Sequence, residues 1–534
     1  MSNIINLKSM RKLFTLALLC MFTYAGFAQD PGTYDETFGI NGFADFAPSA
    51  SHDFLEKVLI QDDGKIITAG RSRYDASNYD TYISRHNPDG TIDATYGIDG
   101  IAHIQPTPAI YINAGRDAAF GKDGLMYVCG YTYDYTNNQG FVCCFDENGF
   151  PNIYFGTDGV TISEYGGGIV YEAIDVDSEG RPVVTGYLND IVLIRRYDLT
   201  GTPDASFGDN GTVIVDIPNS LFSFAYDIQI LSDDRIVIAG FRVDELTYSH
   251  EAFVARLLAD GSLDTTFGEG GFVIINASPL SDYANALSVT PEGDYIIAGH
   301  NNLESVDNLP RSEVFVTRVK ADGTVDTSFG TNGFTKFETF SGNGCENNCE
   351  TVTVAHDGQI FGSHYSFNHY TEESRAYIFN LDTNGQLKES FAGTGILPIT
   401  ASNLDIDGIV EIRTYSVALN ADGKLIVGGY AYNNDGWSSE IFIGCVNTDV
   451  QPVIGCEEIE AKGFNVYPNP ATSTVFVEAD DNAQLSIIDL TGRCVKSVEI
   501  TGNATINVED INKGVYFMMI QNGDSRLVEK LVIK

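Results

Sequence analysis

Short runs of alternating hydrophobic and polar residues fill most of the chain, and they are grouped into similar units along the sequence. In the first unit, period-2 alternation predicts strands at Lys57–Gln61, Lys65–Gly70, Thr81–His86 and Ile101–Ile104. Asp-Gly turns connect the first strand to the second and follow the third strand, as expected for tight antiparallel connections. Each unit is therefore predicted to be a four-stranded antiparallel sheet.

A turn motif of the form Asp-x-x-Phe-Gly-x-x-Gly follows the third predicted strand of the units. Its aromatic residue lies 52 to 62 residues from the next one along the chain, at Phe38, Tyr96, Phe155, Phe207, Phe267, Phe329 and Phe391. The last of these copies is degenerate, with Lys388 and Ala392 at the Asp and first Gly positions. Such a period indicates structural repeats that stack into one body. The predicted fold is all-β, a seven-bladed β-propeller of about 60-residue repeats.

The two ends of the repeat array complement each other. The last unit has its third strand at Ile441–Val446 and continues into Asp449–Pro452 without the turn motif or a fourth strand. The first motif, Tyr34–Phe46, is a fourth strand that no preceding three accompany. We therefore expect the N-terminal strand to complete the seventh blade, which removes the exposed sheet edges of an open array.

An arginine and an aspartate recur eight residues apart around the third strand and its turn. The pairs are Arg85 with Asp93, Arg196 with Asp204, Arg256 with Asp264, and Arg318 with Asp326. In the second and sixth units both partners change together, and in the seventh Cys445 would meet Asp35. An Arg–carboxylate pair that fixes the hairpin of each blade explains this pattern better than catalysis does.

The unit from Arg256 to Gly271 resembles the repeat of the delta-60 family of predicted propellers. The resemblance covers about residues 30 to 448. It implies the propeller fold for residues 29–450 and implies no reaction.

The N-terminal residues 1–28 have the composition of an export signal. Basic residues precede the apolar run Leu13–Phe22, and small residues precede a cleavage site after Ala28. Lipidation at Cys20 is disfavoured because Leu19 stands before it, where a small residue is expected. No later stretch is long and apolar enough for a membrane-spanning helix, so we expect no transmembrane segment in the mature chain.

The pattern changes after an acidic linker at residues 451–463. Alternating strands at Thr474–Glu478, Leu485–Asp489 and Val515–Ile520 predict a small β-sandwich over residues 464–534. The residues that identify this region further are Tyr467, Pro468, Asn469, Pro470, Gly492, Gly514, Tyr516 and Lys530. They resemble the type A C-terminal sorting domain of the type IX secretion system. The resemblance implies the type IX machinery as a partner, removal of the domain on export, and a secreted or outer cell-surface location; an ordinary immunoglobulin-like binding module is the alternative.

The chain is strongly acidic, with 73 Asp and Glu against 31 Lys and Arg and a formal net charge of -42. Such a charge repels phosphate backbones and anionic lipids, so no nucleic-acid partner is expected. It mainly serves solubility, and it leaves calcium binding open; no other cofactor is evident. Eight cysteines follow Cys20 and permit disulfides, including Cys345 with Cys349 in one loop and Cys129 facing Cys143 or Cys144.

The loops between the second and third strands differ from blade to blade and are rich in tyrosine, asparagine and aspartate. Variable loops on a regular scaffold are common binding surfaces, and aromatic rings stack on sugars. The candidate ligand-binding residues are Trp437, Tyr432, Tyr430, Tyr365, Tyr370, Tyr133, Tyr135, Tyr74 and Tyr248. The alternative for each tyrosine is packing of one loop against another.

No catalytic motif of the metalloprotease, serine-hydrolase, nucleotide-binding or sialidase type occurs in the sequence. His364 and His369 with Glu372 and Glu373 are a weak candidate for a metal site, and we expect no metal. The preferred hypothesis is an exported propeller that binds or adheres to an extracellular carbohydrate or protein, rather than an enzyme. A hydrolase or lyase acting on polysaccharide and a structural surface-layer component are the alternatives. Two carboxylates and a basic residue brought together from different blades would favour the enzyme.

Overall fold

A computed structural model describes most of the repeat region and parts of the C-terminal region. The described residues are 30–49, 51–73, 78–107, 112–163, 168–304, 309–404, 406, 408–433, 438–452, 466–467, 469–477, 482–489, 494–509, 511–522 and 525–534. The predicted export signal at residues 1–28 lies outside them. The chain divides into two compact units, Met1–Pro452 and Val453–Lys534.

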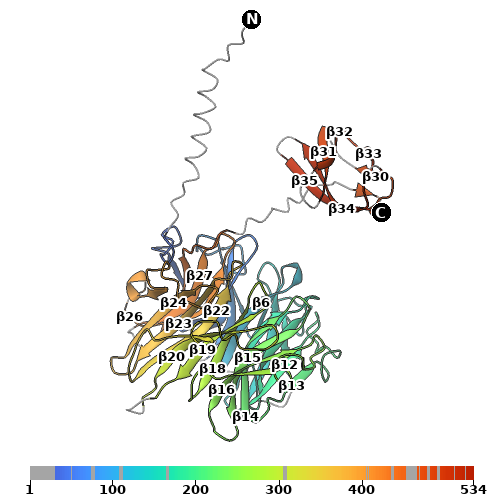
Figure 1. Cartoon of the computed structure of the whole chain (residues 1–534). Coiled ribbons are helices and arrows are strands. Elements are labelled where there is room, and N and C mark those ends of the chain that lie inside the picture. Colours follow the sequence, from blue (N-terminus) through green and yellow to red (C-terminus); the bar gives the residue numbers. More distant parts are fainter. Residues whose placement is uncertain are drawn as a thin grey trace, which may run out of the picture. The chain divides into compact units, whose positions relative to one another are not determined.

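The first unit contains seven four-stranded antiparallel sheets (Figure 1). In six of them four consecutive strands pair in chain order, and in the seventh the N-terminal strand pairs with the last strand of the array. Blade 1 consists of β2 (Asp53–Ile60), β3 (Ile66–Ser72), β4 (Asp80–His86) and β5 (Ile101–Ile104). Blade 2 consists of β6 (Ile112–Phe120), β7 (Met126–Tyr133), β8 (Asn138–Phe145) and β9 (Val160–Ile162). Blade 3 consists of β10 (Ile169–Val176), β11 (Pro182–Leu188), β12 (Ile191–Arg196) and β13 (Thr212–Val215). Blade 4 consists of β14 (Ser220–Ile230), β15 (Ile236–Asp244), β16 (His250–Leu257) and β17 (Phe272–Ile275).

The remaining three sheets complete the array. Blade 5 consists of β18 (Asp282–Val289), β19 (Tyr295–Asn302), β20 (Ser312–Val319) and β21 (Phe334–Phe337). Blade 6 consists of β22 (Cys345–Val354), β23 (Ile360–Asn368), β24 (Glu373–Leu381) and β25 (Ile396–Ile399). Blade 7 combines β26 (Ile409–Leu419), β27 (Leu425–Asn433) and β28 (Ser439–Val446) with the N-terminal strand β1 (Phe43–Phe46). Two short 3₁₀ helices, Lys122–Gly124 and Ala401–Asn403, lie in connections.

The N-terminal strand closes the ring, as the sequence predicts. Strand β1 pairs antiparallel with β28, so that Phe43 lies opposite Gly444 and Phe46 opposite Ile441. The Phe43 ring is buried and contacts Phe442 with ring centroids 6.0 Å apart. The expected seven-bladed, all-β architecture is confirmed.

The hydrophobic core lies between neighbouring blades. One cluster joins Ile67 and Ile83 of blade 1 to Val128 and Phe141 of blade 2, and the other clusters of this unit combine adjacent blades in the same way. Because both faces of each sheet are covered by the next sheets, the central strands are apolar on both faces rather than strictly alternating.

The recurring turn motif connects each blade to the next one. The N–H of its first glycine donates to a carbonyl in the next blade's turn, for example from Gly97 to Asn148 at 2.7 Å. In the degenerate copy the Ala392 N–H of blade 6 donates to the Pro31 carbonyl at 3.1 Å. Pro31 precedes the N-terminal strand that completes blade 7, so blades 6 and 7 are connected in the same way. A Cβ at Gly90, which has a positive φ of 86°, would lie 2.8 Å from the Phe38 ring. The glycine and the aromatic residue of successive repeats therefore fit against each other.

The innermost strands begin earlier than the sequence predicts. Strand β2 starts at Asp53, whereas the alternation pointed to Lys57. The pairing of β2 with β3 skips Glu56, which is a β-bulge. A bulge inserts one extra residue into a strand and so interrupts the period-2 pattern; here the polar residues Glu56 and Lys57 follow each other.

The second unit contains a three-stranded and a four-stranded sheet, which are the two sheets of the predicted sandwich. The first consists of β29 (Val466–Tyr467), β30 (Thr474–Val477) and β33 (Ala504–Asn507). The second consists of β31 (Asn482–Asp489), β32 (Cys494–Thr501), β34 (Gly514–Asn522) and β35 (Ser525–Ile533). Val475, Leu485, Ile500 and Leu531 share its core.

Most of the residues that carry the resemblance to the sorting domain are among the described residues of this unit. Tyr467 is half-exposed and packs against Phe476 with ring centroids 5.1 Å apart. The Asn469–Pro470 peptide bond is cis, and the Tyr516 hydroxyl donates to the Asn512 carbonyl at 2.8 Å. Gly514 begins β34 and Lys530 lies in β35, opposite Phe517. Pro468 and Gly492 lie outside the described residues.

Two sequence expectations about cysteines are wrong. Cys345 and Cys349 lie in strand β22 rather than in a loop, and Cys129 pairs with Val142 rather than with Cys143 or Cys144. The six cysteines described in the propeller are free thiols, and all are buried. Buried thiols behave as small hydrophobic side chains, which explains their place in the strands.

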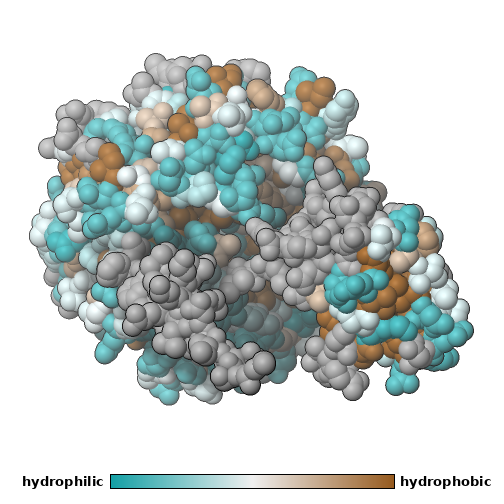
Figure 2. Space-filling view, turned by 90° about the horizontal axis from the view of Figure 1, so that it is seen from above, coloured by the Kyte–Doolittle hydropathy of each residue, from teal (hydrophilic) through white to brown (hydrophobic). Residues whose placement is uncertain are grey.

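Among the residues that the structure describes, no helix is long and apolar enough to cross a membrane. The view in Figure 2 shows a mainly hydrophilic propeller surface, with hydrophobic residues scattered in small groups.

Candidate functional site: a polar ring in the central channel

All seven innermost strands carry a β-bulge at the same place, and the bulged residues point into one cavity. In blade order, these residues are Glu56, Arg116, Glu172, Tyr226, Asn285, Glu350 and Tyr415. All seven line a cavity of about 360 Å³. Bulges commonly re-aim side chains next to functional sites. Each blade therefore contributes one polar or phenolic side chain to a single ring.

Three neighbouring members of this polar ring form a charged group. Arg116 donates from Nε to Glu172 at 2.8 Å, and its Nη1 lies 3.4 Å from a carboxylate oxygen of Glu56. Arg71 also approaches Glu56, at 3.6 Å. The structure thus brings two carboxylates and a basic residue together from blades 1, 2 and 3.

Glu350 has a different environment on the other side of the ring. Among the described residues its carboxylate has neither a hydrogen bond nor an ion pair. Burial raises the pKa of Glu350 to about 7, although the positive charges of Arg413 and Arg116 act in the opposite direction. Arg413 itself lies over the Tyr365 ring, 4.7 Å from its centroid, and is paired with Glu411. Glu350 is therefore a carboxyl group that can change protonation near neutral pH.

In several blades, the residue that follows the bulge has a structural role. The Asp117 carboxylate accepts a hydrogen bond from the Ile174 N–H of blade 3 at 3.0 Å. The Asp227 carboxylate accepts one from the Leu287 N–H of blade 5 at 2.7 Å. The Ser416 hydroxyl accepts one from the Val58 N–H of blade 1 at 3.0 Å across the closure. These side chains connect the inner strands of adjacent blades.

Lys57, the residue after the bulge in blade 1, also lines the cavity and adds a positive charge there. Its Nζ lies 2.9 Å from Asp117. Burial raises the pKa of Asp227 to about 7, and the nearby Lys57 counteracts this rise. Lys57 thus places one positive charge beside the acidic side chains of Asp117 and Asp227.

Aromatic side chains border the cavity on the side of the variable loops. Tyr283 stacks on His300 with ring centroids 4.7 Å apart, and Phe241 contacts Tyr283 at 4.9 Å. Tyr415 stacks on Tyr430 at 5.5 Å. The cavity therefore combines hydrogen-bonding groups with aromatic walls.

The predicted ligand-binding tyrosines fall into three groups. Tyr430, Tyr432 and Tyr365 lie in strands rather than in loops, because β27 and β23 extend further than expected. Tyr430 stacks on the cavity residue Tyr415 and contacts Tyr432, but none of the three candidates lines the cavity itself. Tyr133 also lies in a strand, at the end of β7. Tyr135, Tyr248 and Tyr370 are in loops and strongly exposed, at 65%, 70% and 57%. Trp437 and Tyr74 lie outside the described residues.

Sequence reasoning missed the polar ring itself. The consecutive polar pairs Glu56-Lys57 and Arg116-Asp117 within otherwise apolar strands were the available indication. A repeat-by-repeat alignment of the inner strands would have brought all seven bulged residues into one column.

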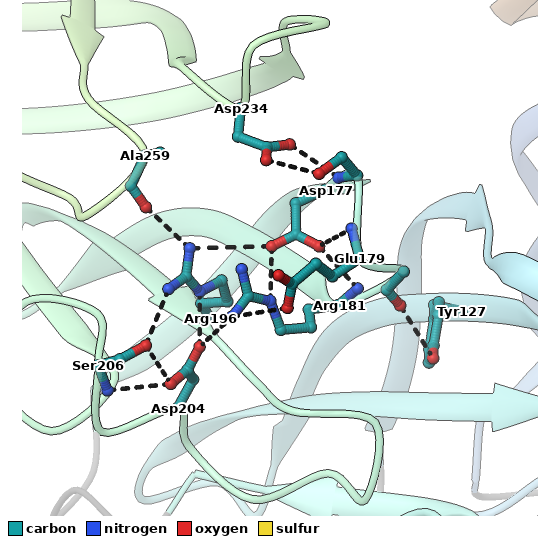
Figure 3. Close-up of polar contacts among 11 residues, drawn as sticks. Tyr127, Asp177, Glu179, Arg181, Arg196, Asp204, Ser206, Asp234 and Ala259 are labelled. Carbon is teal, nitrogen blue, oxygen red and sulfur yellow. Dashed lines mark hydrogen bonds and ion pairs between the residues drawn. The ribbon is translucent and has the colours of Figure 1, made fainter. Parts of the chain in front are cut away.

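The recurring arginines lie near the ends of the third strands, and their aspartates lie in the turns that follow; Figure 3 shows the pair of blade 3. The Nε–Oδ2 distances are 2.8 Å for Arg85–Asp93, 2.9 Å for Arg196–Asp204, 2.8 Å for Arg256–Asp264 and 2.9 Å for Arg318–Asp326. Each guanidinium also donates to a carbonyl of the next blade, as Arg196 does to Ala259 at 2.8 Å. It lies over the motif's aromatic ring as well, 4.6 Å from the Phe207 centroid in the case of Arg196.

A second basic residue, which the sequence analysis overlooked, joins several of these pairs. It stands just before the second strand, as Lys65, Arg181, Arg235 and Lys424. Lys424 pairs with Asp35, so that blade 7 keeps an ion pair although Cys445 replaces its arginine. In blade 6 a lysine, Lys388, stands at the motif position that holds aspartate in other blades. Its Nζ donates to the Asp449 carboxylate and to the side-chain carbonyl of Gln359.

The histidine and glutamate residues considered for a metal site are not arranged as one. His364 is buried in β23 and stacks on Tyr377 at 5.0 Å, whereas His369 lies 3.3 Å from Glu346. Among the described residues no group of three or more His, Cys, Asp or Glu side chains is arranged to hold a metal ion.

Two family models match the chain. The domain of unknown function DUF5122, a β-propeller family, matches residues 61–96, 231–267 and 421–449. The secretion system C-terminal sorting domain matches residues 465–534. The chain therefore carries DUF5122 β-propeller repeats followed by a C-terminal sorting domain of the type IX secretion system. It is a secreted or cell-surface propeller, and the resemblances inferred from the sequence are confirmed.

Solved structures are similar to the chain at low sequence identity. No curated protein matches the chain. Virginiamycin B lyase from Staphylococcus aureus is similar at 10% identity and TM-score 0.41, over 75% of this chain and 98% of that chain. The α-L-arabinanase of Penicillium chrysogenum gives 8% identity and TM-score 0.38, over 76% and 97%. Regucalcin from Agrobacterium tumefaciens gives 12% identity and TM-score 0.32, over 65% and 95%.

Proposed function

We propose that this exported propeller binds an extracellular carbohydrate at the mouth of its central channel. The observation that carries the proposal is the ring of seven bulged residues, one from each blade, around a single cavity. Carboxylates, a guanidinium, an amide and phenols can together accept and donate hydrogen bonds to several hydroxyl groups. Aromatic walls beside them suit the C–H faces of sugar rings.

Charge balance favours a neutral sugar. The negative charges of Glu56 and Glu172 are matched by Arg116 and Arg71. Glu350 is left with accepting capacity, and a buried acceptor that gains a donor from the ligand improves binding. An anionic ligand would face Glu350, and a phosphate or uronate would also meet the overall negative charge of the chain.

In this proposal the channel mouth is the ligand site, and the sorting domain directs the propeller out of the cell. Removal of that domain on export, through the linker at residues 451–463, is part of the same proposal. Residues 1–28 would provide the export signal. The binding function would then be adhesion to, or capture of, glycan at the cell exterior.

An array of neutral, amino and uronic-acid oligosaccharides tests the proposal, with the chain compared with its Glu350→Gln and Arg116→Met variants. We expect selective binding of a neutral glycan, weakened about tenfold or more by either substitution, because a charged hydrogen bond contributes about 1.5–3 kcal/mol. The Tyr248→Ala variant is the matched control, since Tyr248 is exposed and does not line the channel cavity. Absence of binding to any glycan, or binding that both channel variants retain, would refute the proposal.

Hydrolysis or lyase cleavage of a polysaccharide is the second candidate. It is favoured by the Glu56–Arg116–Glu172 group, which is the arrangement of two carboxylates and a basic residue from different blades expected of an enzyme, and by the elevated pKa of Glu350. A carboxyl group with a pKa near 7 is suited to donate a proton to a leaving oxygen. Release of reducing ends from neutral polysaccharides, lost in Glu350→Gln, would support this activity, and binding without any product would exclude it for the glycan tested.

A further inference from the structure

A second hollow lies between blades 2 and 3, beside the channel. It has a volume of about 450 Å³, and its walls include Tyr131, Tyr133 and Asn138 of blade 2 with Tyr187 of blade 3. Tyr131 and Tyr133 are two residues apart in β7, so their side chains lie on the same face of that strand. The hollow therefore presents three phenolic rings and an amide.

This second hollow is continuous with the channel site through shared residues. Arg116 and Glu172 line both the central cavity and the hollow between the blades. Their ion pair, 2.8 Å long, thus forms the boundary between the two spaces. A molecule that crosses this ion pair would contact the polar ring at one end and the tyrosines at the other.

We propose that the site takes an oligosaccharide chain, with one end unit in the channel mouth and the following units over Arg116 and Glu172 along the three tyrosines. The inference rests on the proposed carbohydrate binding and extends it to the ligand's length and direction. The channel recognises an end of the chain, because the ring of seven strands encloses it, and the hollow between the blades accommodates the continuation.

The chemistry of the second hollow fits this continuation. Tyr187 is fixed by an edge contact to Phe224, with ring centroids 4.8 Å apart, and Tyr133 contacts Tyr135 at 5.7 Å. Rings already held by neighbours lose little conformational freedom when a sugar stacks on them. Asn138 adds an amide that can both donate and accept at hydroxyl groups.

A similar hollow between blades 4 and 5 provides the comparison within the same molecule. It is lined by Tyr248, Glu251 and Asp282 among others, and it shares no residue with the channel cavity. Continuity with the polar ring therefore distinguishes the hollow at blades 2 and 3 from an ordinary depression between loops.

The test is the dependence of affinity on chain length. Calorimetric titrations would use xylo-, arabino-, manno-, laminari- and cello-oligosaccharides of one to six units with the full chain and its Tyr133→Ala and Tyr187→Ala variants. We expect affinity to rise with length, and each substitution to cost about tenfold for four units or more but less than twofold for one or two units, as for a lost aromatic contact. Tyr248→Ala should leave every length unchanged.

The outcomes separate this inference from the function on which it rests. Equal losses for all lengths, or no loss with either tyrosine variant, would overturn the extended site while sugar binding in the channel stands. An affinity that is independent of length in the unaltered chain would also overturn it. If none of these sugars binds the unaltered chain, the proposed function fails for this panel and the extended site fails with it.

Discussion

At the residue scale, the most informative contrast is between two kinds of charged group in one propeller. The Arg–Asp pair recurs in four of the seven blades, each pair is joined to the next blade, and its chemistry is the same in all four. The ring in the channel instead carries four residue types at its seven equivalent positions, with Glu, Arg, Glu, Tyr, Asn, Glu and Tyr in turn. Repetition indicates a structural role, whereas variation at an equivalent position indicates a site adapted to a ligand.

The acid–base behaviour of Glu350 leads to a prediction about stability. Its pKa is raised from 4.5 to about 7 in the folded state, so the folded chain holds this proton more tightly than the unfolded chain. Stability from this group is complete below pH 4.5 and is lost as the pH rises to about 7, by up to about 3 kcal/mol. We expect Glu350→Gln to be more stable than the parent at pH 8 and nearly equal to it at pH 4.5. Denaturant unfolding at both pH values measures this difference, and a variant that is less stable at pH 8 would contradict the assignment.

The repeated arginine should not be replaceable by lysine. Arg196 bonds Asp204, Ser206 and the Ala259 carbonyl while lying over Phe207. Lysine cannot form this planar set of hydrogen bonds, so Arg196→Lys should lower the free energy of unfolding by about 1–3 kcal/mol. Chemical denaturation provides the measurement, with the exposed Lys122→Arg as the control. An unchanged stability would show that the pair is dispensable.

At the scale of elements, the closing strand β1 holds the two ends of the array together. Phe43 of this strand is buried in the core shared by blades 6 and 7. Replacing a buried phenylalanine by alanine typically costs about 3–5 kcal/mol. We expect Phe43→Ala to lower the melting temperature clearly, whereas Ile40→Ala, at a side chain 56% exposed, should change it little. Equal melting temperatures for both variants would show that the closure does not limit stability.

The sequence predicted the blades and their closure because these depend on local and repeated patterns. Glycine-containing turns, short apolar strands and the aromatic turn motif recur from unit to unit, so each supports the assignment of the others. The bulges could not be found in the same way, because Glu56 and Lys57 follow each other in a strand and break the period-2 alternation. The candidate tyrosines were taken for loop residues for a related reason, since alternating Tyr430 and Tyr432 continue β27 beyond the apolar run.

The site was missed in the sequence because it depends on a comparison of equivalent positions in all blades rather than on a motif in any one blade. Glu56, Arg116 and Glu172 are about one repeat apart, and no motif connects them. Their contact follows from the placement of equivalent positions around a common axis. The repeats must therefore be aligned with one another before the charged group can be recognised.

At the scale of the whole molecule, the propeller and the sorting domain have separate tasks. Each has its own hydrophobic core, so we expect a chain that ends at Pro452 to keep the melting temperature of the propeller. The same truncation should abolish secretion, because it removes the matched sorting domain. Fractionation of the producing cells with detection of the propeller gives the measurement, with the full-length Tyr248→Ala variant as the control. Normal secretion of the truncated chain would contradict this division of tasks.

The central claim, a carbohydrate site at the channel mouth, is tested most directly by a crystal structure of the chain with an oligosaccharide selected on the array. We predict that a sugar unit lies within hydrogen-bond distance of Glu350 or Arg116 and that the chain continues toward Tyr133. A sugar bound elsewhere on the propeller, with the channel cavity holding only water, would contradict the account.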